Sequence, residues 1–593
     1  MLKTSFILSQ YSYLIIFILS IFGYGQAILL NISKKLNDHW LESCLQITLG
    51  LGVFNLLIQF LAIIGYMHEK EIYLIIICGL LFFGFKAYYT FRKKENLFYK
   101  VYKNRIPDLL FAILPFVLLL PTLISPLFPP IAFDELMYHL PHAAQWAKSG
   151  KLDINEWLRY PWFPYNIDLL YSAAIIIKDD IFTHLIHTFT AWMVAIIIYK
   201  LVLKYSVRMV ALIAVTIWID ISKDLIGTAY IDLCLSLYIF VGAITFFFWM
   251  ENKNDTSFLW LSSFMFGLAA GSKYQSLGFV PLFIVMLVIT AKELDIYLKS
   301  SIFFLIPCIY WYLRNAILTG DPFDPLGGKL FGYYDWNAKD MELQLADLKS
   351  NANMPPFVIW SALIPLFSPN TYKNSLYRWC VIFTVYSFIV WYFTSHYDRY
   401  LMSSYPIMSI LSAKGIYKII KYPINLFKTS GLPSRYNNLL STMLISIIFI
   451  ILTYKSTIEF LDFFNKLPVT LIEKNDFLKK TIPSIELYKQ LKEDKKLKIY
   501  QGGLSGHIYY LPNPIWGEIF GPWRYSDIDY MNPKQLTNKL SYQGFNMLLI
   551  RKDAMNKYFS KYSDFFSFFE LYKSTTDVDA YKIKTQDKLP RVE

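Results

Sequence analysis

Apolar runs close to 20 residues long recur along most of this sequence, and they restrict the chain to few kinds of fold. A helix needs about 20 apolar residues to cross a bilayer. Runs near that length occupy residues 13–33, 44–66, 71–90, 106–128, 181–203, 208–222, 229–250, 258–272, 275–291, 300–318, 357–368, 378–394, 400–420 and 438–454. The chain is 55% hydrophobic with a mean hydropathy of +0.37, too apolar for a soluble protein of 593 residues. We therefore expect a polytopic all-α transmembrane bundle of about 12–14 spans.

The basic residues lie mainly in short loops between the apolar runs. Two such groups are Arg92, Lys93, Lys94, Lys100, Lys103 and Arg105, and Lys414, Lys418 and Lys421. Lysine and arginine gather in the cytoplasmic loops of membrane proteins, so the net charge of +13 indicates topology and not a nucleic-acid surface. With these loops inside, loops 129–180 and 319–356 and the C-terminal tail lie outside. We expect an integral protein of the bacterial cytoplasmic membrane, in contact with its lipids, whose two large loops and tail are extracytoplasmic.

This topology predicts three regions. Residues 1–105 contain the first spans and a basic cytoplasmic loop. Residues 106–454 contain the remaining spans and the two large outer loops, and residues 455–593 form a small extracytoplasmic α/β domain. The five cysteines lie in or beside apolar runs without metal-ligand spacing, so they are interpreted as core residues.

The C-terminal region shows both helical and strand patterns. Residues 483–494 have helical periodicity, and Asn532-Pro533 is typical of a helix start. Residues 497–500 and 546–550 are typical of buried strands. Trp516, Trp523 and Tyr525 are candidates for stacking on sugars, although packing in the core is the simpler explanation for them.

The first outer loop begins with two adjacent acids, Asp134 and Glu135, directly after an apolar run. A carboxylate so close to a membrane is costly unless it is paired or functional. The alternative is that Asp134 caps the helix that follows it. Further along the same loop, an apolar stripe from Leu169 to Ile177 favours a helix lying in the membrane interface.

Charged residues also occur at the expected outer ends of other spans. These are Asp232 in TAYID, Lys273 in GLAAGSKY, Arg314 in LRNAILTGDPFDP and Arg399 in DRYLMSSYP. Each cation alone is explained by snorkelling to lipid headgroups. Together, carboxylates and cations at one membrane face suit a reaction with an anionic leaving group and a hydroxyl that loses a proton.

The order of these motifs resembles the GT-C superfamily of polytopic glycosyltransferases, in particular its protein-mannosyltransferase and aminoarabinose-transferase branch. The resemblance covers residues 106–420 and rests on Asp134-Glu135 with Tyr138, followed by the four motifs above. It implies an enzyme that transfers a sugar, with inversion, from a polyprenyl-phosphate donor to a hydroxyl of a lipid, glycan or protein acceptor. The three leading spans and the tyrosine-rich YHLPHAAQW are departures from the family pattern, so they leave donor and acceptor identity open.

The resemblance also implies roles for single residues. Asp134 matches the acceptor base and Asp232 the later catalytic carboxylate. Lys273 and Arg399 match the positions expected near the donor phosphate, with Arg314 a weaker match.

Glu135, Tyr138, His139 and His142 are expected to line the acceptor cleft. Because Glu135, His139 and His142 are spaced i, i+4 and i+7, they would share one helical face and could hold a divalent metal. The simpler alternative is local hydrogen bonding of both imidazoles, and Pro141 makes an unbroken helix less secure. No cofactor is otherwise indicated.

Three other functions fit parts of the pattern. A lipid-linked oligosaccharide polymerase or ligase uses the same carrier and the same membrane face. A secondary transporter would place its charges near the midplane on broken helices, whereas here they lie at span ends. A non-catalytic scaffold would not need an acid at residue 134.

Overall fold

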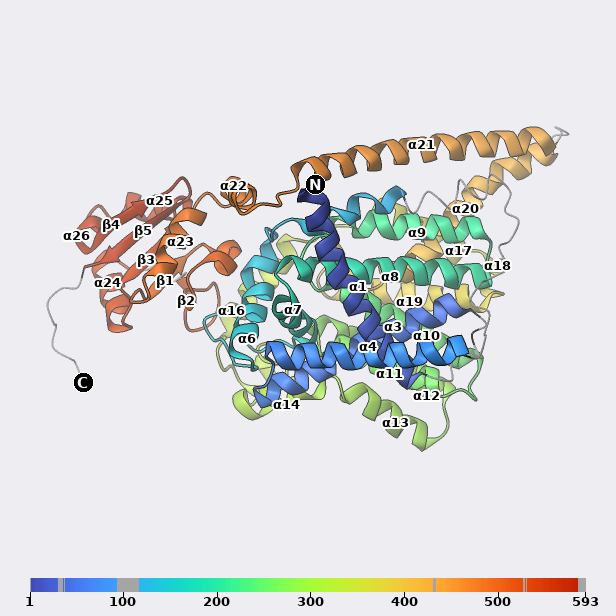
Figure 1. Ribbon diagram of the computed structural model, residues 1–593, viewed down its shortest axis with the longest axis horizontal. Helices are drawn as coiled ribbons and strands as arrows, with labels where there is room; N and C mark the ends of the chain where they lie inside the picture. The colour runs from blue at the N-terminus through green and yellow to red at the C-terminus, as the bar shows by residue number, and fades with distance from the viewer. Residues whose placement is uncertain are drawn as a thin grey trace. The chain divides into compact units, whose positions relative to one another are not determined.

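The computed structural model describes residues 2–29, 36, 38–92, 117–429, 434–525, 528 and 531–584. The chain forms two compact units. Unit 1 comprises Met1–Phe128, Pro164–Tyr312 and Leu345–Leu467, and unit 2 comprises Pro129–Phe163, Leu313–Gln344 and Pro468–Glu593. Unit 1 is helical, and unit 2 carries the sheet (Figure 1).

Six helices of unit 1 are long and apolar enough to cross a membrane, among the residues that the structure describes. They are α1 (Leu2–Ile28), α3 (His39–Ile64), α4 (Glu69–Arg92), α8 (Ile181–Tyr205), α10 (Asp232–Glu251) and α19 (Ser375–Phe393). These helices correspond to six of the predicted runs, and they make the chain a multi-pass membrane protein.

The other helices of unit 1 are shorter, interrupted or less apolar. They are α7 (Asn166–Ile177), α9 (Arg208–Ser222), α11 (Ser257–Ala270), α12 (Val280–Thr290), α13 (Leu294–Leu305), α14 (Ile309–Thr319, which continues into unit 2), α17 (Leu363–Leu366), α18 (Pro369–Tyr372), α20 (Tyr405–Thr429) and α21 (Ser434–Lys466). Short 3₁₀ turns join several of them at Pro121–Leu123, Ser125–Leu127, Lys223–Leu225, Tyr274–Phe279, Phe357–Ala362 and Asp398–Leu401. The predicted 12–14 spans are reached only if such shorter helices also cross.

Three expected spans differ from the prediction, and proline is present at each break. The run 300–318 is a pair of helices, α13 and α14, bent by 71° around Pro307. Part of the run 106–128 lies outside the described residues, and its described part contains two 3₁₀ turns, Pro121–Leu123 and Ser125–Leu127, that include Pro121 and Pro126. The run 357–368 is a 3₁₀ turn followed by the four-residue α17.

The helix expected to lie in the membrane interface is instead buried in the bundle. Every residue of α7 from Asn166 to Ala174 is buried, whereas an interfacial helix keeps one face in contact with water. Its first residue explains part of this burial. The side chain of Asn166 accepts a hydrogen bond from Nε1 of Trp311 at 2.7 Å and donates one to the carbonyl of Pro307 at 2.8 Å.

The first helices of unit 1 approach each other closely through glycine. A Cβ atom at Gly25 of α1 would lie 1.7 Å from the carbonyl oxygen of Gln46 in α3, and one at Gly50 of α3 would lie 1.7 Å from that of Ile21. Small residues at such crossings allow close backbone packing within a membrane.

Unit 2 contains a five-stranded mixed sheet in the order β2-β1-β3-β5-β4. The strands are β1 (Ile499–Gly502), β2 (Ile515–Trp516), β3 (Met547–Arg551), β4 (Phe569–Ser574) and β5 (Val578–Ile583). β1 pairs in parallel with β2 and β3, while β5 is antiparallel to β3 and β4. The predicted α/β character of the C-terminal region is confirmed.

Apolar side chains cover both faces of this sheet. The helices and turns of unit 2 are η3 (Glu135–His139), α6 (Leu140–Ser149), α15 (Gly328–Phe331), α16 (Ala338–Ser350, which continues into unit 1), α22 (Leu471–Thr481), α23 (Ile485–Glu493), η8 (Ser505–Tyr510), α24 (Pro533–Tyr542), α25 (Lys552–Lys561) and α26 (Phe565–Phe568). One face packs against α23, and the other packs against α24 and α26 (Figure 1). Burial on both sides explains why β3 has the continuous apolar pattern Met547 to Ile550.

Candidate active site

In unit 1 a single carboxylate bridges two cations. Asp232 is the first residue of α10, Lys273 precedes the 3₁₀ turn Tyr274–Phe279, and Arg399 lies in the 3₁₀ turn Asp398–Leu401. Nζ of Lys273 is 3.0 Å from one carboxylate oxygen of Asp232, and Nε of Arg399 is 3.2 Å from the other. We call these three residues the cation–carboxylate triad. The structure thus brings together three of the residues selected from separate motifs.

The triad is largely withdrawn from solvent, and aromatic rings surround its cations. The side chain of Asp232 is 3% exposed, while those of Lys273 and Arg399 are 14% and 16% exposed. The guanidinium of Arg399 lies 4.4 Å from the ring centre of Tyr230, and the Lys273 ammonium lies 5.1 Å from that of Tyr400. Rings of this kind attract cations by their quadrupole.

The helix start that carries Asp232 is fixed by neighbouring groups. The backbone N–H of Leu233 donates to Nε2 of His187 at 3.0 Å. The hydroxyl of Ser236 donates to the carbonyls of Asp232 and Met402. Two cations and one carboxylate give the triad a formal charge of +1, and such a charge in a poorly hydrated site attracts an anion strongly.

Asp134 belongs to unit 2, in the segment Pro129–Phe163, which we call the acid-bearing segment. It directly precedes the π-helical turn η3 and leads into α6. The Asp134 side chain makes no capping hydrogen bond to this helix, so the capping alternative is wrong. The carboxylate of Glu135 has that role, because it accepts the N–H groups of Ile131 and Ala132 at 2.6 Å each.

The π turn accommodates the proline that made this helix uncertain. The N–H of Leu140 donates to the carbonyl of Glu135, five residues earlier, and Pro141, which lacks an N–H, follows at the start of α6. A π turn of this kind often accompanies a functional site. It also changes the angular spacing of Glu135, His139 and His142 from that of an α-helix.

The side chains expected in the acceptor cleft are buried. Glu135, His139 and His142 are at most 1% exposed, and Tyr138 is 9% exposed. Nε2 of His142 donates to the backbone carbonyl of Arg159 at 2.9 Å, and burial lowers the pKa of His142 to about 3. His142 is therefore neutral at physiological pH and holds the backbone at residue 159.

The part of the chain that the structure describes contains no set of side chains arranged as metal ligands. No group of three or more His, Cys, Asp or Glu side chains there is arranged to hold a metal ion, Glu135, His139 and His142 included. The divalent metal that Glu135, His139 and His142 could hold stays a prediction.

A buried ion pair joins the acid-bearing segment to the C-terminal part of unit 2. The guanidinium of Arg159 donates through Nε and Nη2 to one carboxylate oxygen of Glu518, with both side chains 9% exposed. Burial disfavours the charge on Arg159, but Glu518 more than compensates and raises its pKa. Leu136 and Leu158 also pack in the core beside β1 and β3.

Arg314 belongs to unit 2, where it contacts the acid-bearing segment. Its guanidinium donates to Oδ1 of Asn315, at 3.0 Å from Nε and 2.8 Å from Nη2, and lies 5.6 Å from the ring centre of Trp162. Asn315 in turn donates to the carbonyl of Trp162 at 2.7 Å. These contacts give Arg314 a structural role, in addition to the contact with the donor phosphate that was predicted for it.

Several of these residues were missed by sequence reasoning. Tyr400 directly follows Arg399, and Tyr230 lies two residues before Asp232, so both rings stand in motifs that the sequence had already identified. Arg159 and Glu518 are 359 residues apart in the sequence, and nothing in either local pattern indicates the pairing.

Known protein sequences match parts of this chain, and solved structures are similar to its fold. The family model described as SF2091/S2213 matches residues 473–582. The uncharacterized protein SF2092/S2214 of Shigella flexneri is 28% identical over 144 residues, which are 22% of this chain and 77% of that protein. The uncharacterized protein SF2093/S2215 of the same organism is 30% identical over 189 residues, which are 31% of this chain and 90% of that protein.

Two solved structures are similar across most of the chain. ArnT from Cupriavidus metallidurans bound to undecaprenyl phosphate covers 82% of this chain and 99% of its own, with a TM-score of 0.49 and 10% identity. The Archaeoglobus fulgidus oligosaccharyltransferase in the apo form covers 82% and 76%, with a TM-score of 0.47 and 11% identity. At these TM-scores the likeness carries no argument about substrate or catalytic residues.

Proposed function

We propose that this chain, a member of the family that includes the Shigella flexneri protein SF2093/S2215, is a membrane glycosyltransferase of GT-C type. It transfers a sugar with inversion from a polyprenyl-phosphate donor to a hydroxyl of a lipid, glycan or protein acceptor. The reaction takes place at the outer face of the bacterial cytoplasmic membrane. The observation that carries this proposal is the cation–carboxylate triad, because charged side chains in a membrane bundle are costly and mark functional sites.

The triad supplies the electrophilic side of the reaction. As the bond between the anomeric carbon and the phosphate oxygen breaks, the polyprenyl phosphate gains negative charge. Lys273 and Arg399 stabilise that charge, with Arg314 a further candidate contact. Asp232 acts as a positioning residue, since its two carboxylate oxygens hold both cations in place.

Asp134 supplies the base. Its carboxylate removes the proton from the acceptor hydroxyl while the hydroxyl oxygen bonds to the anomeric carbon, and the products are the glycoside and the free polyprenyl phosphate. Support comes from two features of the acid-bearing segment: Glu135 and not Asp134 caps the helix, and a π turn shapes the backbone directly after Asp134. A positioned general base contributes about 10²–10⁴-fold to a rate.

The test is sugar transfer by the full chain in proteoliposomes, using a panel of radiolabelled polyprenyl-phosphate monosaccharides and crude cell-envelope acceptor. We expect one donor to be used and Asp134→Asn to reduce its transfer by about 10²–10⁴-fold. Asp153→Asn is the matched control. It lies in the same segment, where its carboxylate forms an exposed ion pair with Lys151, and it should retain wild-type activity.

Two outcomes contradict the proposal. Equal transfer by wild type and Asp134→Asn removes the base. Transfer only from lipid-linked oligosaccharides assigns the chain to the polymerases and ligases instead.

A further inference from the structure

The segment of residues 320–334, which we call the apolar loop, carries large apolar side chains on its surface. It follows α14 directly and belongs to unit 2. Five of its side chains are at least 38% exposed: Phe323, Leu326, Leu330, Phe331 and Tyr334. Large apolar groups gathered in this way on a surface mark contact with a membrane or with another protein.

The acids of the apolar loop are turned inward. Asp321 and Asp324 are 1% and 2% exposed, and Oδ1 of Asp321 accepts the N–H of Phe323 at 2.8 Å. A Cβ atom at Gly327 would lie 2.2 Å from the same oxygen, so glycine allows the loop to close over this carboxylate. The exposed charge of the loop is Lys329. A loop surrounded by water would instead expose its acids and bury its apolar side chains.

Hydrogen bonds within the apolar loop occupy much of its backbone. The N–H groups of Leu326, Leu330 and Phe331 donate to carbonyls three or four residues earlier, at 2.8 to 3.1 Å. Pro322 and Pro325 have no N–H to satisfy. An unpaired backbone N–H is costly where lipid replaces water. This internal bonding therefore lowers the cost of placing the loop at a membrane surface.

The apolar loop continues an apolar face that begins on α14. The pair α13 and α14 is together apolar enough to cross a membrane. On α14, Leu313 and Ile317 are 51% and 77% exposed, and their spacing of four residues places them on one face of the helix. Because the loop follows this face without a break in the chain, a bilayer is a better occupant than a protein partner.

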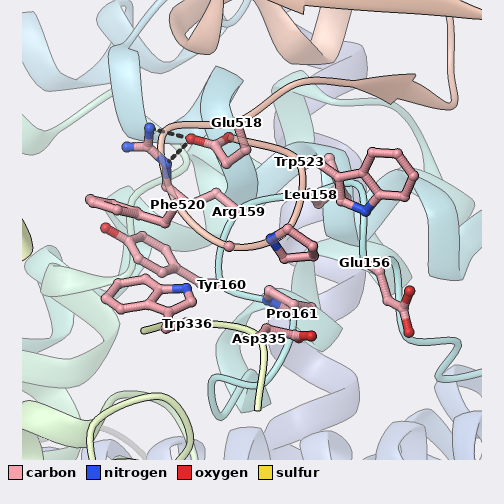
Figure 2. Close-up of a pocket in the computed structure, with 12 residues that line it drawn as sticks. Glu156, Leu158, Arg159, Tyr160, Pro161, Asp335, Trp336, Glu518, Phe520 and Trp523 are labelled. Atoms are coloured by element: carbon pink, nitrogen blue, oxygen red, sulfur yellow. Dashed lines mark hydrogen bonds and ion pairs between the residues drawn. The ribbon is translucent and has the colours of Figure 1, made fainter. Parts of the chain in front are cut away.

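The C-terminal end of the apolar loop is attached to the interior of unit 2. Trp336 is 6% exposed, and its ring centre lies 4.5 Å from that of Phe520. Figure 2 shows Trp336 gathered with Tyr160 and Phe520. Asp335 accepts a hydrogen bond from Nε1 of Trp162. The exposed side chains thus lie between α14 and a buried aromatic anchor.

We propose that the apolar loop lies in the interface of the phospholipid bilayer. Leu330 and Phe331, both on α15, insert between the acyl chains, and Lys329 extends to the lipid phosphates. The loop stays at the level where headgroups meet acyl chains, because irregular backbone is not found exposed to lipid in the hydrocarbon core. This inference goes beyond the proposed function and does not depend on sugar transfer.

The experiment is EPR power saturation of the spin-labelled full-length chain in nanodiscs of phosphatidylethanolamine and phosphatidylglycerol. Four of the five native cysteines are buried, so Cys78→Ala gives a background in which an added cysteine carries the label. Leu330→Cys, at 87% exposure, reports on the apolar loop, and Tyr542→Cys on α24 is the matched control, because Tyr542 is 93% exposed. We expect oxygen to relax the label at residue 330 several-fold more than a water-soluble nickel chelate does. The order should be reversed at residue 542.

Two results overturn the proposal. Equal access of the nickel chelate to residues 330 and 542 would place the apolar loop in water. Low access of both oxygen and nickel at residue 330 would show that a protein surface covers the loop, a second copy of this chain included.

A second label position guards against an effect of the Leu330→Cys substitution itself. With the label on Phe323→Cys, the double substitution Leu330→Asp and Phe331→Asp should raise nickel access at residue 323 several-fold, because carboxylates are costly to place among acyl chains. Unchanged nickel access there would contradict insertion of the loop. No transfer is measured, so either result leaves the transferase proposal standing.

Discussion

Arg399 is the residue of the triad at which the effect of side-chain charge can be tested separately from the effect of side-chain shape. Its Nε bonds to Asp232 and its plane lies over Tyr230, so lysine would keep the charge but lose the planar fork. We expect Arg399→Gln to raise the KM for the donor at least tenfold, and Arg399→Lys to recover part of the loss. Arg378→Gln, an exposed arginine on α19, is the control. Donor kinetics unchanged in both Arg399 variants would remove this residue from the phosphate site.

Asp324 gives unit 2 a dependence on pH. Burial, with Asp335 and Asp321 nearby, raises the pKa of Asp324 to about 7, while Thr319 and Arg314 oppose the shift. The folded state then binds a proton more tightly than the unfolded state, whose pKa is about 3.9. The contribution of Asp324 to the free energy of unfolding is therefore lost as the pH rises from about 4 to about 7, and it changes little above pH 7.

Melting of wild type and Asp324→Asn across this pH range checks the expectation. The asparagine variant should melt at a temperature that depends less on pH between 4 and 7, and Asp347→Asn, an exposed acid, should behave as wild type. Identical pH profiles for wild type and Asp324→Asn would show that Asp324 ionises normally.

At the scale of elements, the acid-bearing segment is fixed to the sheet domain by Arg159 and Glu518. Removing one partner of a buried ion pair leaves a buried charge and costs about 3–5 kcal/mol. Arg159→Met and Glu518→Leu should each increase hydrogen exchange at the amides of β1 and β3, and the double variant should exchange less than either. Arg551→Met breaks the exposed pair with Asp553 and should have little effect. Additive effects in the double variant would mean that the pair is not coupled.

The sequence predicted elements well where one pattern ran without interruption. The predicted run 208–222 is α9, and 229–250 is α10 to within a few residues. The strands β1 and β3 were identified because both of their faces are buried. Prolines divided three other runs, and hydropathy averaged over a window does not detect such breaks.

The candidate site could be predicted only in part, because local residue patterns do not specify backbone bonding or contacts between distant segments. Asp232, Lys273 and Arg399 each stand in a short motif at the end of an apolar run, so their positions were visible. The π turn after Asp134 depends on backbone bonding that no residue pattern specifies. The pairing of Arg159 with Glu518 depends on tertiary folding of segments far apart in the chain.

At the scale of the whole molecule, the sequence alternates between two units. Unit 2 is assembled from the segments Pro129–Phe163, Leu313–Gln344 and Pro468–Glu593, which leave and re-enter the membrane unit. The C-terminal domain therefore supports the segment that carries Asp134, through Leu136, Leu158 and Glu518. For the proposed chemistry, this whole unit must face the outside of the cell, where the lipid-linked sugar and the acceptor hydroxyl meet.

Sidedness of the acid-bearing segment tests this central claim most directly. In a chain without its native cysteines, Lys151→Cys places a thiol at an exposed position in that segment, and Lys373→Cys places one in a loop expected to be cytoplasmic. A membrane-impermeant maleimide added to intact cells should label the first variant and leave the second unlabelled until the membrane is permeabilised. Labelling of Lys373→Cys in intact cells, with Lys151→Cys protected, would contradict the account, because Asp134 would then face the cytoplasm.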